Sequence, residues 1–172
     1  MNNKKGVRNL AVAGLFTAII FIVTGFLHVP THNGYTHFGD AFIYLVASIL
    51  PLPYAIVSSA VGAALADGSS GFVIWMPATI IVKSLTACFF TSKKDRIITK
   101  RNIIAIIPSL VVCACGYGFY EAAIITDKSI WSSLTAVLVT VPSYVIQVIL
   151  SAVVYISIGI AMDKFNFKKR FK

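Results

Sequence analysis

Lys83 stands near the middle of an apolar stretch that is long enough to cross a bilayer. A charge at that depth costs at least about 2.5–3.5 kcal/mol, so it is usually retained where a buried partner or a ligand compensates it. Four other polar side chains lie in or at the ends of apolar segments: Asp40, Asp67, Glu121 and Gln147. An ammonium, carboxylates and an amide can pair with one another or orient a small ligand. The sequence therefore predicts a membrane protein with a polar binding site.

Helical spacing places aromatic and polar residues beside these side chains. Trp75, Thr79 and Lys83 recur every fourth residue and form one stripe of a helix. Three further sets share a helix face: Cys113, Tyr117, Tyr120 and Glu121; Tyr144, Gln147, Ser151 and Tyr155; and Asp40 with Tyr44. Such rings and polar groups suit a small aromatic ligand, although polar stripes also hold helices together. We expect Tyr44 and Tyr155 to be packing residues.

The histidines and cysteines do not predict a metal site. His28, His32 and His37 share one loop, with no acidic or cysteine partner at ligand spacing. We expect His37 to act in loop gating or ligand contact instead. Cys113 and Cys115 point to nearly opposite faces of a helix. All three cysteines lie in apolar segments and are expected to be packing residues.

No sequence motif indicates an enzyme. The chain has no GxSxG, HExxH or Walker sequence. We therefore expect no catalytic residue, no nucleotide site, no cofactor and no metal. If the protein moves a solute uphill, the energy must come from a partner or from an ion gradient.

The composition defines the class of protein. Of the 172 residues, 58% are hydrophobic and 12% are charged, whereas soluble domains carry roughly 25% charged residues. We expect one all-α integral membrane domain over residues 1–172, without a soluble domain. The first apolar segment, Leu10 to Leu27, follows a basic start, and we interpret it as a retained helix rather than a signal peptide.

Six transmembrane helices are expected along the chain. Pro51-Leu-Pro53 divides one apolar stretch, because proline interrupts a helix. Two short helices, or a re-entrant hairpin, result. The expected segments are Asn9–Leu27, the two halves of Ala41–Ala66, Phe72–Phe90, Ile103–Ile125 and Leu134–Met162.

The basic residues set the expected topology. All Lys and Arg except Lys83 and Lys128 fall in three clusters: Lys4, Lys5 and Arg8; Lys93, Lys94, Arg96, Lys100 and Arg101; and Lys164, Lys168, Lys169, Arg170 and Lys172. Six crossings put all three clusters on one side, which the positive-inside rule makes the cytoplasm. Both termini are then cytoplasmic, in a bacterial plasma membrane. This topology predicts a polar depression open to the outside, with Lys83 and Gln147 near its floor.

These residues resemble the S components of energy-coupling factor (ECF) transporters, which are small six-helix membrane subunits for vitamin uptake. Three motifs carry the resemblance: Tyr35, His37, Gly39 and Asp40 in Tyr-x-His-x-Gly-Asp; Asp67, Gly71 and Phe72 in Ala-x-x-Asp-x-x-x-Gly-aromatic; and Pro77, Thr79 and Lys83 in Pro-Ala-Thr-x-x-x-Lys. The likeness is greatest to the branch associated with pyridoxine and hydroxymethylpyrimidine. The expected substrate-binding residues are Tyr35, His37, Asp40, Asp67, Trp75, Thr79, Lys83, Tyr117, Glu121 and Gln147.

The resemblance also implies partners. An S component binds its vitamin from outside, docks on a transmembrane coupling protein with two ATPases, and topples to release the ligand inside. Docking uses small residues on the first helix, which correspond here to Ala11, Gly14 and Ala18. Small residues at this spacing let helices approach closely. Gly14 could instead pack against the chain's own helices.

Several alternatives stay open from the sequence. Lys83 could form a structural ion pair with Asp40 or Asp67, contact the ligand, or do both. The whole chain could be a stand-alone secondary carrier or channel. It could also be an intramembrane enzyme in which Asp40, Asp67 and Lys83 are catalytic.

Overall fold

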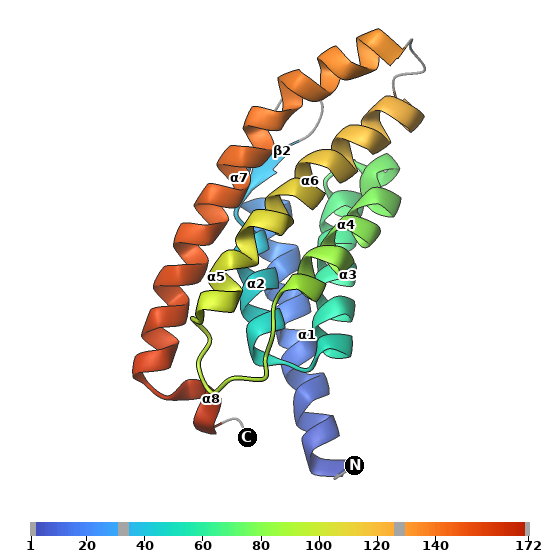
Figure 1. The fold of residues 1–172 in the computed structure, drawn as a ribbon. Coiled ribbons are helices and arrows are strands. Elements are labelled where there is room, and N and C mark those ends of the chain that lie inside the picture. The colour runs from blue at the N-terminus through green and yellow to red at the C-terminus, as the bar shows by residue number, and fades with distance from the viewer. Residues whose placement is uncertain (1–2, 31–34, 126–129, 171–172) are drawn as a thin grey trace.

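The short helix α2 (Asp40–Ile49) lies inside a bundle formed by the longer helices, as the computed structural model in Figure 1 shows. The structure describes residues 3–30, 35–125 and 130–170. The other helical elements are α1 (Asn3–Phe26), α3 (Leu52–Ser69), η1 (Val73–Trp75), α4 (Met76–Phe89), α5 (Lys100–Ile104), α6 (Ile106–Tyr120), the π-helical turn η2 (Glu121–Ile125), α7 (Ile130–Lys164) and α8 (Phe167–Arg170).

α2 is buried on nearly every side. All of its residues except Phe42 are buried, and it contacts α1, α3, α4 and α7. A helix that is apolar around its whole circumference is stable only when neighbours cover it. α2 ends at Leu50, which is extended before Pro51, and α3 then begins at Leu52. The predicted break at Pro51-Leu-Pro53 is therefore confirmed and separates two helices.

Close helix packing surrounds α2. α1 packs on α3, α3 on α4, α4 on α6, and α6 on α7. Gly62 brings α3 against α1, because a Cβ atom there would lie 2.7 Å from the Thr17 carbonyl oxygen. The Ser58 hydroxyl donates a 2.9 Å hydrogen bond to the Ala13 carbonyl across the same interface. These contacts hold the outer helices in place around the site.

The helices have the length and polarity of a membrane protein. Within the described residues, three helical segments are long and apolar enough to cross a bilayer: Lys4–Phe26, Lys100–Ala123 and Val141–Lys164. Shorter apolar helices occupy Asp40–Ile49 and Val73–Phe89. The all-α membrane class is thus confirmed, while the count of six crossings stays a prediction.

The expected outer loop contains a β-hairpin that the sequence did not predict. β1 (His28–Pro30) and β2 (Tyr35–His37) are antiparallel, with His28 opposite His37. Backbone groups away from water need hydrogen-bond partners, and the strand pairing supplies them. β2 also contacts α7, so the hairpin is fixed to the bundle.

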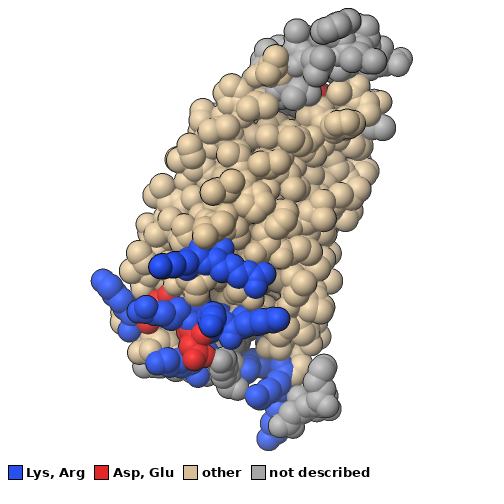
Figure 2. All heavy atoms as spheres, in the orientation of Figure 1, with Lys and Arg blue, Asp and Glu red and all other residues tan. Residues whose placement is uncertain are grey.

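Both ends of the chain lie at one end of the bundle. α1 begins and α8 ends there, as Figure 1 shows. Lys and Arg side chains gather at this end in Figure 2, and the middle of the visible face carries few charges. We call this the basic end. The hairpin lies toward the opposite end, so the two ends of α2 face different surroundings.

Candidate functional site

Three helices meet at a buried ion pair. Lys83 on α4 places its Nζ atom 2.7 Å from Oδ1 of Asp40, and both side chains are about 2% exposed. Asp40 is in the first turn of α2, where the helix dipole favours a negative charge. Gln147 on α7 donates a 2.9 Å hydrogen bond from Nε2 to Asp40 Oδ2. Asp40 therefore connects α2 to both α4 and α7.

Two residues of α6 complete the surroundings of the Lys83 ammonium. Its Nζ atom lies 4.0 Å from Cys113 Sγ and 5.3 Å from the centre of the Tyr117 ring. A cation over an aromatic face is attracted by the electrons of the ring. Cys113 also lies 3.9 Å from Gln147 Nε2. The sequence predicts only a packing role for Cys113, because a thiol in an apolar segment gives no signal of a polar neighbour.

An aromatic wall adjoins the ion pair. The Tyr117 ring stacks on Tyr144 with 5.4 Å between ring centres, and the Trp75 ring meets it edge-on at 6.0 Å. The Tyr117 hydroxyl is 3.0 Å from the Thr79 hydroxyl. Trp75 also lies 5.9 Å from Tyr120. The predicted stripe of Trp75, Thr79 and Lys83 thus converges on one residue, Tyr117.

The β-hairpin covers the site. The Tyr35 hydroxyl donates a short hydrogen bond to Asp67 Oδ1, and the Tyr35 ring lies 5.1 Å from Phe72 and 4.5 Å from His28. The pKa of Tyr35 is raised, first because it is buried and then because of the Asp67 charge. Asp67 is therefore a partner of the hairpin, whereas Lys83 pairs with Asp40.

His37 anchors the turn between the hairpin and α2. Its side chain is 8% exposed, and Nδ1 accepts a 3.1 Å hydrogen bond from the Gly39 amide. Burial lowers the pKa of His37 to about 4, because the charged imidazolium loses its hydration. A Cβ atom on Gly39 would lie 2.0 Å from Thr24 Oγ1. This position therefore requires glycine for space.

The site is closed in this structure, whereas the sequence predicted an open depression. Lys83, Asp40 and Gln147 are each at most 2% exposed. The hairpin, which is not visible as a sequence pattern, contacts α1 and α7 at this end of the bundle. Asp67 Oδ2 is buried and has no hydrogen bond of normal geometry within the described part of the chain, although the Thr79 hydroxyl acts on the same carboxylate.

The other residues that the sequence predicted for ligand binding, packing or docking lie elsewhere in the fold. Glu121 is buried at the start of η2. Tyr44 and Tyr155 pack with Phe90 in the core, as expected. His32 lies outside the described residues. The proposed docking residues lie on the exposed face of α1: Ala11, Gly14 and Ala18.

A second polar network at the other end of α2 was missed by sequence reasoning. The fully buried Asn102 shares the two N–H donors of Nδ2 among Ser48 Oγ and the carbonyls of Thr91 and Ile97, at 3.0–3.1 Å. Its Oδ1 accepts from the Thr91 amide at 3.0 Å. Tyr155 also contacts Ser48, at 3.0 Å. In the sequence, Asn102 follows directly after Lys100 and Arg101. An uncharged amide in that position is typical of an exposed residue, so it gave no sign of a buried network.

A helical membrane bundle that encloses polar and aromatic side chains is typical of membrane proteins that bind a small solute. Residues 4–164 match the family described as ECF-type riboflavin transporter, S component. The chain belongs to this family, and it is the substrate-binding subunit of an ECF transporter. The match supports an S component that works with an ECF module, without selecting the pyridoxine and hydroxymethylpyrimidine branch. The chain matches no curated protein and no solved structure at a significant level.

Proposed function

We propose that this S component captures a small heteroaromatic vitamin or vitamin precursor, with hydroxymethylpyrimidine or pyridoxine as the best candidates. The observation that carries the proposal is the buried cluster of Lys83, Asp40 and Gln147 beside the Tyr117 ring. A ligand site of this kind combines a ring surface for stacking with a few polar groups that orient the ligand.

The polar groups suit a nitrogen ring with small substituents. Lys83 and Gln147 can donate hydrogen bonds to ring nitrogens or hydroxyls, and Asp40 can accept from amino or hydroxyl groups. A further donor group on the ligand would supply a hydrogen bond to the buried Oδ2 atom of Asp67. The expected substrate-binding residues also include Tyr35 and His37 of the hairpin.

Ligand size favours a single ring. The family description names riboflavin, which has three fused rings. Here the Lys83 ammonium contacts Asp40 and lies over Tyr117 directly. A one-ring ligand needs a smaller displacement of these side chains than a three-ring ligand does. Riboflavin is therefore the alternative ligand that an experiment must test.

The proposed topology has six crossings in a single domain over residues 1–172, with both termini in the cytoplasm of a bacterial cell. Two observations support it. α1 begins and α8 ends at the same end of the bundle, and the visible Lys and Arg side chains gather there. The positive-inside rule assigns such an end to the cytoplasm.

The proposed partners are a transmembrane coupling protein and two ATPase subunits, which would dock on the small residues of α1. Ala11, Gly14 and Ala18 are exposed. Nothing lies within 4 Å of a Cβ atom placed on Gly14, which argues against its packing on the chain's own helices. A partner helix could approach this stripe closely.

The test is to identify the ligand. We expect mass spectrometry of the purified full chain to detect a co-purified one-ring heteroaromatic compound. Calorimetry should then give a tighter Kd for hydroxymethylpyrimidine or pyridoxine than for riboflavin. Tight binding of riboflavin alone would refute the substrate proposal and leave the S-component assignment intact.

Two further measurements separate the alternative classes. Uptake by an S component should require the ATPases of the coupling module. Uptake that continues without them would favour a secondary carrier or channel. Chemical conversion of the ligand by the purified chain would favour an intramembrane enzyme.

A further inference from the structure

Polar side chains meet at two levels along the interface between α2 and α7. At the hairpin end, Gln147 Nε2 donates a 2.9 Å hydrogen bond to Asp40 Oδ2. At the basic end, the hydroxyls of Ser48 and Tyr155 are 3.0 Å apart. The two pairs are separated by eight residues on each helix. The two helices therefore run in the same direction and stay in register between these levels.

Tyr44 and Ser151 form a middle layer between these pairs, because each lies four residues from the pair above and from the pair below. Both side chains are completely buried. Neither the Tyr44 hydroxyl nor the Ser151 hydroxyl has a hydrogen-bond partner of normal geometry within the described part of the chain. Buried hydroxyls are normally hydrogen-bonded. The middle layer thus differs from the layers on either side, whose polar groups bind each other.

The ring of Tyr44 is fixed by packing, and its hydroxyl lies near the buried ion pair. The ring stacks on Phe90 with 4.7 Å between ring centres and meets Tyr155 edge-on at 5.8 Å. The charged groups that act electrostatically on its hydroxyl include Asp40 and Lys83. A phenylalanine would provide the same packing without burying a hydroxyl. The packing expected for Tyr44 therefore explains its ring but not its hydroxyl.

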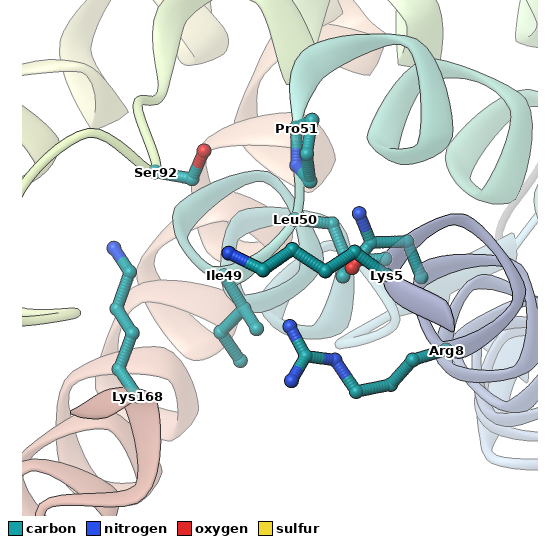
Figure 3. Close-up of a pocket in the computed structure, with 8 residues that line it drawn as sticks. Lys5, Arg8, Ile49, Leu50, Pro51, Ser92 and Lys168 are labelled. Carbon is teal, nitrogen blue, oxygen red and sulfur yellow. The ribbon is translucent and has the colours of Figure 1, made fainter. Parts of the chain in front are cut away.

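The basic end of this interface is closed by the chain itself. Lys168 donates a 2.6 Å hydrogen bond to the Ser48 carbonyl, and Asn102 Nδ2 lies 3.0 Å from Ser48 Oγ. Figure 3 shows Lys168 at this end, where it borders a cavity together with Ile49 and Leu50. The polar groups of Ser48 have their partners here. The middle layer is therefore reached most directly from the side of Asp40.

We propose that Tyr44 and Ser151 form the floor of the substrate site and that their hydroxyls bind the polar group of the ligand that reaches deepest. The inference rests on the proposed function, since it takes the ligand to be a one-ring compound held by Lys83 and Asp40. A hydroxyl can both donate and accept, so the pair matches a hydroxyl, an amino group or a ring nitrogen. Asp40 and Tyr44 are about 6 Å apart along α2, a separation that one substituted ring can bridge.

The test is calorimetry of the full-length protein in detergent with pyridoxine, hydroxymethylpyrimidine and riboflavin. We expect Tyr44→Phe to weaken binding of the preferred compound about fivefold, the usual effect of one lost hydrogen bond. Ser151→Ala, on the facing helix, should act in the same direction. The Tm of both ligand-free variants should stay equal or rise, because neither change removes a hydrogen bond between described residues.

The matched control for Tyr44→Phe is Tyr155→Phe, which removes a hydroxyl from the same group of rings. The Tyr155 hydroxyl contacts Ser48 and donates a 3.1 Å hydrogen bond to the Ile97 carbonyl. This variant should therefore have a lower Tm and a Kd within about twofold of the wild type. Ser157→Ala is the control for Ser151→Ala, since Ser157 donates to a carbonyl of its own helix, and it should leave the Kd unchanged.

A second measurement separates a direct contact from a general disturbance of the site. Analogues of the preferred compound that each lack one polar atom are titrated into the wild type and into Tyr44→Phe. For one analogue the two proteins should bind equally, because the partner of the hydroxyl is then missing from the ligand.

Three results would overturn the proposal. An unchanged Kd in both Tyr44→Phe and Ser151→Ala would show that the hydroxyls do not contact the ligand, and a lower Tm in the same variants would assign them to a buried water. Equal weakening by Tyr155→Phe would indicate disturbed packing of the rings. Equal loss of affinity for every analogue would exclude a specific contact. Failure of the proposed function is distinguishable, because the wild type would then prefer riboflavin whatever the effect of Tyr44→Phe.

Discussion

Lys83 and Asp40 form an ion pair, with 2.7 Å between Nζ and Oδ1, that joins α4 to the enclosed helix α2. Both side chains are about 2% exposed, so neither charge has access to bulk water in the closed form. Removing one partner of a buried pair leaves the other charge uncompensated, which costs about 3–5 kcal/mol. The pair therefore matters for stability whether or not the ligand touches it.

We expect Lys83→Met to lower the Tm and to weaken ligand binding at least about tenfold, because Asp40 is left as an uncompensated buried charge. Adding Asp40→Asn should recover part of the Tm, since neither charge then remains. Thermal unfolding and calorimetry measure the two effects separately. Lys94→Met, in an exposed loop, is the control and should change neither.

The double variant decides the role of Lys83. If the ammonium contacts the ligand, binding stays weak after the Tm has recovered. Binding that returns to the wild-type level would show that Lys83 is structural only, and it would contradict the place of Lys83 in the substrate site.

Acid should destabilise the hairpin through His37. The pKa of His37 in the folded protein is lowered to about 4 by burial, below the usual value of about 6.5. The folded state therefore favours neutral His37. Its contribution to stability is complete above pH about 6.5 and is lost as the pH falls toward about 4. NMR titration of His37 and Tm measured across this range test the expectation.

The control for this pH dependence keeps the hydrogen bond to Gly39. His37→Asn retains an acceptor near the position of Nδ1 but cannot take up a proton in this range. The pH dependence of the Tm between about 6.5 and 4 should shrink in this variant. Asp40, Lys83 and His28 also act on the charge of His37. An undiminished pH dependence would show that His37 is not its source.

Gly39→Ala should displace the hairpin. The new Cβ atom would lie 2.0 Å from Thr24 Oγ1, and overpacking of this kind costs about 1–3 kcal/mol. We expect a lower Tm and ligand binding that is weaker by about tenfold. Adding Thr24→Ala should restore part of both, because it removes the clashing hydroxyl. Gly14→Ala is the matched control, since nothing lies within 4 Å of its Cβ position.

Local sequence patterns predicted the helices and the break at Pro51, because periodicity and proline act over a few residues. They also selected most of the residues around Lys83. They did not decide between Asp40 and Asp67 as its partner. That choice depends on how α2, α3 and α4 are rotated against one another, which is set by packing such as the contact of Gly62 with α1.

Features that depend on contacts between distant residues were missed. The hairpin pairs strands of only three residues, which are too short to show an alternating pattern. Lys168 was grouped with a basic tail, yet its ammonium is buried against the Ser48 carbonyl. Asn102 forms hydrogen bonds to Ser48 and Thr91, which lie 54 and 11 residues earlier in the chain. Such contacts become visible only when the helices are in place.

Asn102→Asp should destabilise the basic end while leaving ligand binding intact. The substitution keeps the shape of the side chain but replaces the Nδ2 donor with an oxygen that faces the Ser48 hydroxyl and two carbonyls. Leaving buried polar groups unpaired costs about 1–3 kcal/mol for each group. We expect a clearly lower Tm and faster proteolysis of residues 90–99. Asn9→Asp, on partly exposed α1, is the control for the added charge. A normal Tm in the Asn102 variant would show that the network adds little.

Gly14→Leu should prevent assembly with the coupling module while leaving the isolated subunit unchanged. The expected small-residue stripe of Ala11, Gly14 and Ala18 is exposed on α1, and a bulky side chain there would keep a partner helix at a distance. Nothing within 4 Å of the Gly14 Cβ position would be displaced, so the Tm and the ligand Kd should stay at their wild-type values. Co-purification with the module and ATP-dependent uptake measure the loss.

The matched control for this prediction is Ala161→Leu, which adds the same side chain on an exposed position of α7. It should assemble normally, because α7 is not the expected docking face. Ala18→Leu, on the stripe, should behave like Gly14→Leu. If both stripe variants assembled as well as the Ala161 variant, the module would have to dock on another face. If all three failed to assemble, added bulk at any lipid-facing position would explain the loss, and α1 would have no special part in docking.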